Sequence, residues 1–140
     1  MKTAKILALL CGLTLCFTFA ATEEADAGYY GGWNYYNSYG YYYTTYNYSP
    51  YRHHYCVYYP SYPRYVYYYN PYSGYWWGRF DLEGKPGQQY SLLAKEDQRA
   101  KLTDIPESAF PAPGEMPLVP ESKDSDARVE LPPTPPELKN

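Results

Sequence analysis

The first feature in the pattern of apolar and polar positions is an apolar run over residues 6–21, which follows two lysines. A transmembrane helix needs about 20 apolar residues, so the run is too short to span a bilayer. A positive flank, a short apolar core and small residues after it predict a secretory signal peptide over residues 1–27. We expect cleavage after Ala27, with Ala20 as the alternative, and an uncleaved anchor is a further alternative. The mature chain is then secreted or resides in the periplasm or cell envelope, without a stable membrane span.

The next stretch, residues 28–63, shows neither a helical nor a strict period-2 pattern, because tyrosines occur in pairs and triplets. Its first part reads GYYGGWNYYNSYGYYYTTYNYS, a mixture of Tyr with Gly, Asn, Ser and Thr. Segments that alternate aromatic and small polar residues in this way are typically disordered and prone to self-association. We therefore predict a low-complexity segment without regular structure.

Residues 64–94 have a different pattern, which predicts a small antiparallel β-meander. The runs RYVYYY and YWWGRFDL are rich in strand formers and are separated by NPYSG, a turn sequence. Pro71 suits the first central position of this turn, and Gly74 suits a position with positive φ. A second turn at EGKPG leads to QQYSLLA as the third strand.

The tail, residues 95–140, is acidic and rich in proline, which interrupts both helix and sheet. We expect it to be extended. The predicted fold class is therefore mostly irregular or disordered: a signal-peptide helix, a β-meander at about 64–94 and an extended tail. Units below about 40 residues need outside support, so either the tail packs over the meander or assembly with other molecules supplies the burial.

Composition and charge narrow the function classes. The chain has 22 Tyr among 140 residues and a formal charge of −3, and residues 28–80 contain 21 of the tyrosines and no acidic residue. Residues 81–140 carry 12 acidic and 7 basic residues, a net charge of −5. This balance argues against a nucleic-acid-binding protein. The sequence also lacks a nucleophile elbow or a phosphate-binding loop, so we expect no enzyme and no cofactor.

One cluster has metal-ligand chemistry. His53, His54 and Cys56 could bind Cu or Zn, although a closed zinc site needs four ligands. Two exposed polar residues and a solitary thiol are the simpler interpretation. Two other cysteines leave with the signal peptide, so Cys56 is also a candidate for an intermolecular disulfide.

The tyrosines suggest the leading function. A neutral phenol can stack on sugars, aromatic rings or proline rings and donates one hydrogen bond. We predict a non-enzymatic structural or interaction protein whose Tyr-rich segment mediates adhesion, self-assembly or cell-envelope association. The alternatives are a metal-handling protein and a polyproline-binding module that docks its own tail. The candidate aromatic interaction residues are Tyr41, Tyr42, Tyr43, Tyr67, Tyr68, Tyr69, Trp76 and Trp77.

Two resemblances accompany these residues. RYVYYYNPYSGYWW partly resembles the second and third strands of a WW domain, whose groove binds proline-rich ligands; Trp77 sits one residue early and the first Trp of the pattern is absent. The succession YYYNP, YWWGR, YSLLA and DIPESAFP is similar to a group of small secreted Tyr- and Pro-rich bacterial proteins of unassigned function. That resemblance implies export and a C-terminal module, with no activity to transfer.

Overall fold

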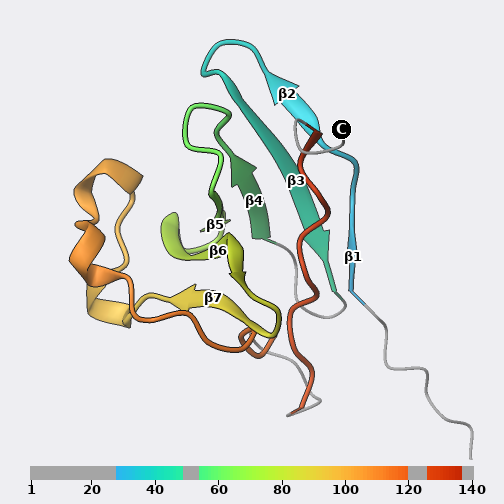
Figure 1. Ribbon diagram of the computed structural model, residues 1–140. Helices are drawn as coiled ribbons and strands as arrows, with labels where there is room; N and C mark the ends of the chain where they lie inside the picture. Colours follow the sequence, from blue (N-terminus) through green and yellow to red (C-terminus); the bar gives the residue numbers. More distant parts are fainter. Residues whose placement is uncertain (1–27, 49–53, 120–125, 137–140) are drawn as a thin grey trace, which may run out of the picture.

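The computed structural model describes residues 28–48, 54–119 and 126–136, which form an antiparallel seven-stranded sheet curled into a half-barrel (Figure 1). The strands follow the order β1-β3-β4-β5-β6-β7, and β2 pairs with β3 beside β1. Their bounds are β1 Tyr29–Tyr30, β2 Asn34–Tyr36, β3 Tyr41–Asn47, β4 His54–Tyr58, β5 Tyr65–Asn70, β6 Tyr75–Lys85 and β7 Gln88–Leu92. Within these ranges no helix is long and apolar enough to cross a membrane.

This architecture corrects the predicted fold class. The Tyr-rich segment is not disordered in its described part, because it supplies β1 to β4 of the sheet. The strands expected at 64–94 are present as β5, β6 and β7, but they continue into the same sheet instead of forming a separate small meander. The expectation failed because tyrosine occupies both faces of the strands, and its apolar ring and polar hydroxyl suit either face.

Glycines in the left-handed region close the three tight hairpins. Gly40 in the β2–β3 turn has φ 66° and donates its N–H to the carbonyl of Tyr36 at 3.0 Å. Gly74 in the predicted NPYSG turn has φ 72° and bonds in the same way to Asn70 at 2.9 Å. Left-handed backbone at these positions favours glycine, so the expectation for Gly74 is confirmed.

The concave face of the sheet forms the core. Alternate residues of the strands point to it, and tyrosines rather than aliphatic residues fill much of its volume. Tyr46, Tyr58 and Tyr68 are fully buried there, together with Val66. The chain therefore has more interior than a 30-residue meander would provide, because β3 and β4 contribute buried residues and Tyr30 of β1 packs against them.

The C-terminal tail covers part of this core. Val129 and Pro135 are buried, and the tail runs along the β1–β3 side of the sheet (Figure 1). The Tyr30 hydroxyl donates to the carbonyl of Glu130 at 2.7 Å, and the Trp33 indole N–H donates to the carbonyl of Thr134 at 3.1 Å. The sequence left two possible sources of burial, packing of the tail and assembly with other molecules. The structure shows the first of these, because the tail packs over the sheet of its own chain.

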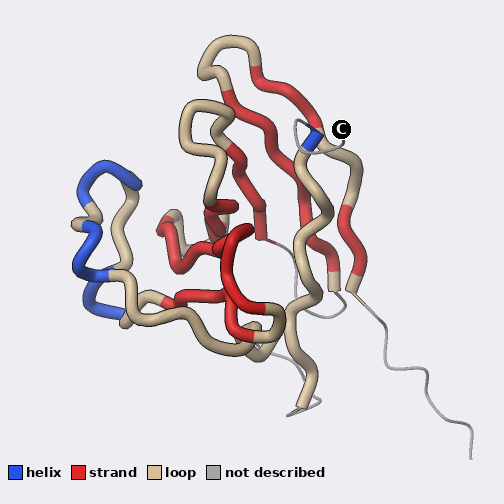
Figure 2. Tube along the Cα trace, in the orientation of Figure 1, coloured by secondary structure: helices blue, strands red, loops and turns tan. Residues whose placement is uncertain are grey.

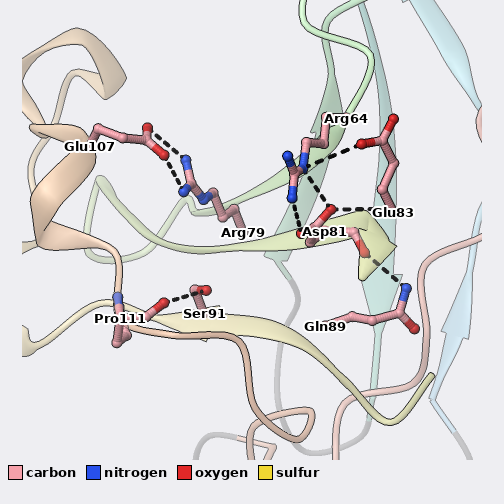
Figure 3. Close-up of polar contacts among 8 residues, drawn as sticks. All are labelled: Arg64, Arg79, Asp81, Glu83, Gln89, Ser91, Glu107 and Pro111. Atoms are coloured by element: carbon pink, nitrogen blue, oxygen red, sulfur yellow. Dashed lines mark hydrogen bonds and ion pairs between the residues drawn. The ribbon is translucent and has the colours of Figure 1, made fainter. Parts of the chain in front are cut away.

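A strap of three 3-10 turns follows β7, drawn as the blue segments at the left of Figure 2. The turns are η1 Lys95–Asp97, η2 Leu102–Asp104 and η3 Glu107–Ala109. The carbonyl of Pro111 accepts a bond from the Ser91 hydroxyl of β7 at 2.8 Å, which ties the end of the strap to the sheet (Figure 3).

Candidate functional site

Opposite the core, the sheet has an outer face on which long aromatic side chains surround one short side chain, Val57. Tyr55 of β4 and Tyr59, the residue just after β4, lie two residues to either side of Val57. On the neighbouring strands, Tyr43 of β3 and Tyr67 of β5 pair directly with Val57. Rings on four sides of a valine leave a depression above it.

Each ring around Val57 contacts a neighbouring ring. Tyr41 and Tyr59 approach edge to face at 5.5 Å between centroids, and Tyr59 contacts Tyr67 at 6.1 Å. On the other side, Tyr55 and Tyr69 are stacked within 4° of parallel at 6.5 Å. Trp76 of β6 contacts Tyr69 at 5.1 Å and Tyr67 at 6.4 Å, so it closes the rim at the β5–β6 side. Edge-to-face and offset contacts of this kind fix the positions of the rings.

The depression is a hollow of about 540 Å³, which we call the aromatic hollow. This volume lies in the range of about 300–1,000 Å³ that is usual for small-molecule pockets. Its lining residues are Tyr36, Tyr41, Tyr43, Tyr55, Val57, Tyr59, Tyr69, Trp76 and Ala100. None of these side chains is charged at neutral pH, and burial raises the pKa of Tyr41 and Tyr59 further. The hollow is therefore neutral, aromatic and rich in hydroxyl groups.

The strap borders the hollow at its β6 side. Trp76 donates its backbone N–H to the carbonyl of Arg99 at 2.9 Å, which brings Ala100 to the rim. Three residues after Trp76 on β6, the Arg79 guanidinium lies 3.9 Å from the centre of the Tyr65 ring and 4.0 Å from the centre of the Phe110 ring. It also forms a two-bonded ion pair with Glu107 (Figure 3). Glu107 and Phe110 belong to DIPESAFP, so this motif clamps Arg79 and holds the strap in place.

The predicted aromatic residues divide between the two faces. The outer face carries Tyr41, Tyr43, Tyr67, Tyr69 and Trp76, and all but Tyr67 line the hollow. Tyr42, Tyr68 and Trp77 instead pack in or against the core. Consecutive strand residues point to opposite faces, which separates members of each Tyr triplet. Trp76 and Trp77 are separated as well, next to a register shift between Tyr68 and Tyr69.

The structure places the described residues of the metal hypothesis inside the core. His54 is fully buried, stacked on Tyr46 at 4.8 Å and tilted against Tyr68 at 5.1 Å. Cys56 is also fully buried, and burial raises the pKa of its thiol. His53 lies outside the described residues, and no group of three potential ligands occurs among the described ones. An intermolecular disulfide through Cys56 would require its strand to open first.

Sequence reasoning missed Val57, the residue that creates the hollow, and its neighbours Tyr55 and Tyr59. The available signal was the pattern YCVYY, in which one β-branched residue interrupts the tyrosines of a strand. That signal becomes informative only when the strand and its pairing with β3 and β5 are known. Val57 matters because of neighbours on other strands.

Comparisons with known proteins add no family to this description. The chain matches no protein-family model, no curated protein and no solved structure at a significant level.

Proposed function

We propose that this protein is an exported, non-enzymatic interaction protein that associates with other molecules through the tyrosine-rich outer face of its sheet. Adhesion, self-assembly and attachment to the cell envelope are all served by such a surface. The observation that carries the proposal is the aromatic hollow, in which seven of nine lining residues are Tyr or Trp. Aromatic side chains provide large contact areas with few rotatable bonds, which is why they dominate binding surfaces.

The described surface around the hollow supports the same proposal. Tyr36 and Tyr39 of the β2–β3 hairpin are 43% and 69% exposed and stack on each other at 5.1 Å. They extend the aromatic surface beyond the hollow, since Tyr36 also contacts Tyr41 at 5.6 Å. Clustered exposed aromatic residues on a soluble domain mark interaction sites more often than isolated ones do.

A pair of double variants tests the proposal. Tyr43→Thr/Tyr69→Thr removes two rings of the outer face and keeps residues with high strand propensity. Tyr29→Thr/Tyr62→Thr is the matched control, because these tyrosines are 65% and 67% exposed and do not line the hollow. Sedimentation over a concentration series measures self-association, and co-sedimentation with insoluble envelope material measures attachment.

We expect wild type and the control to associate alike and the Tyr43/Tyr69 variant to lose most of that association. A wild-type chain that remains a monomer and stays in the supernatant contradicts the proposal. Equal loss in the two double variants also contradicts it, because binding would then depend on total tyrosine content and not on this face.

A further inference from the structure

The molecule contains an example of how its aromatic side chains bind a proline-rich chain. On the core face, the tail segment 130–136 lies against Tyr30 and Trp33, which donate hydrogen bonds to the carbonyls of Glu130 and Thr134. Pro135 is fully buried in this contact region. Indole and phenol groups thus bind the carbonyls of an extended chain while a proline ring is removed from water.

The aromatic hollow is also lined by phenol and indole side chains. Tyr41, Tyr43 and Trp76 contribute two hydroxyl groups and an indole N–H to the residues that line it. Each can donate to a carbonyl, and proline-rich chains have carbonyls without internal hydrogen bonds. The rings beside these donors offer flat surfaces on which a proline ring can pack.

Size and charge agree with such a ligand. The four residue steps from Tyr55 to Tyr59 span about 13 Å in an extended strand. A polyproline-II chain rises about 3.1 Å per residue, so about four residues fit across Val57 between the two rings. No lining side chain is charged at neutral pH, which suits proline, whose ring is uncharged and which needs no partner for a backbone N–H.

We propose that the aromatic hollow is a binding site for an extended, proline-rich segment of another polypeptide. This inference rests on the proposed function and adds the chemical class of the ligand. The segment lies over Val57 with proline rings against Tyr55, Tyr59 and Trp76. Its own chain's tail does not compete for the site, because that segment is seated on the core face. Recognition follows the general mode in which aromatic-lined grooves bind polyproline-II helices, whose low conformational entropy reduces the cost of binding.

Three single variants separate the hollow from the tail-binding residues. Val57→Phe fills the hollow and keeps an apolar strand former at its floor. Trp76→Thr removes a donor and a ring from a half-buried position of the rim. Trp33→Phe is the control, since it removes the indole donor that holds the tail and leaves the hollow unchanged. Far-UV circular dichroism verifies that each variant folds. If Val57→Phe does not fold, the binding measured with Trp76→Thr tests the inference in its place.

The probe is fluorescently labelled decaproline, titrated with the purified full chain and followed by anisotropy. We expect saturable binding to wild type and to Trp33→Phe, and a dissociation constant at least about tenfold weaker for Val57→Phe and Trp76→Thr. A labelled (Gly-Ser)5 peptide should not bind. Absence of saturable decaproline binding, equal binding of the Gly-Ser peptide, or loss of binding only in Trp33→Phe overturns the inference.

A neutral glucan oligosaccharide, cellohexaose, distinguishes failure of this inference from failure of the proposed function. If cellohexaose binds and Val57→Phe abolishes its binding while decaproline does not bind, the inference is wrong and the outer face is still an interaction surface. If neither probe binds and the Tyr43→Thr/Tyr69→Thr variant associates like wild type, the proposed function fails as well.

Discussion

Arg79 shows how single residues hold the surroundings of the hollow in place. Its side chain is only 9% exposed, although it is a cation that starts from the middle of β6. Glu107 supplies the opposite charge, and the Tyr65 and Phe110 rings cover the two sides of the guanidinium. A buried cation is tolerated only with such partners. Removal of Glu107 therefore affects the strap as well as the ion pair.

Acid pH should weaken this contact, and the sign follows from the Glu107 pKa. Hydrogen bonds from Arg79 hold the pKa of Glu107 below its ordinary value of 4.5. A carboxylate with a depressed pKa in the folded state contributes stability above its unfolded pKa, and that contribution disappears as the pH falls through the folded value. Glu107 stabilises the fold at pH 7 and ceases to do so well below pH 4.5.

We therefore expect Glu107→Gln to lower the free energy of unfolding at pH 7 by about 1 kcal/mol, a figure reduced for the exposure of the carboxylate. The difference from wild type should shrink at pH 3. Urea unfolding followed by tryptophan fluorescence measures both values. Glu96→Gln, an exposed carboxylate on the same strap, is the control and should have little effect. A pH-independent loss in Glu107→Gln would show that the ion pair is not its source.

At the scale of elements, the tail acts as a structural cover for the core. Deletion of residues 131–140 removes Pro135 and the acceptor of the Trp33 indole N–H. Burial of one apolar side chain contributes about 1.5–3 kcal/mol, so the deletion should cost at least about 2 kcal/mol. We expect a red shift of tryptophan emission on deletion and no such shift when Trp33→Phe is already present. Unchanged emission in the wild-type background would show that the tail is not seated on Trp33.

The sequence predicted some elements and missed others for one physical reason. The β5–β6 hairpin was predictable because Pro71 and Gly74 identify its turn and strand formers flank it. β3 and β4 were not, because a strand with tyrosine on both faces has no visible period-2 alternation. In YYYTTYN the core side is marked only by Thr44 and Tyr46, which are fully buried, while Tyr43 and Thr45 are partly exposed. Which tyrosine faces the core depends on the register with β4.

The candidate site, like the strands, was predictable only in part. The tyrosine triplets and the Trp pair were identified as interaction residues, and strand geometry then assigned their members to opposite faces. The hollow itself depends on Val57 pairing with Tyr43 and Tyr67, residues that are 14 and 10 positions away in the chain. Such pairing is a property of the sheet and has no local sequence signal.

The whole described molecule is organised as one sheet with two different aromatic faces. The concave face is partly covered by the tail and buries tyrosines as core residues, whereas tyrosines of the outer face line the hollow around Val57. This division explains how a chain with few aliphatic residues can be ordered and still carry tyrosines on its surface. The core and the outer face therefore use different members of the same tyrosine clusters.

The most direct test is the accessibility of individual tyrosine rings in the unliganded protein. NMR spectra of ring-labelled tyrosine, recorded with and without a soluble paramagnetic agent, report this for each assigned residue. The account predicts strong signal loss for Tyr41, Tyr43 and Tyr69 and protection of Tyr46, Tyr58 and Tyr68, which have no exposed surface. Uniform signal loss across all tyrosines, or loss for the second group together with the first, would contradict it.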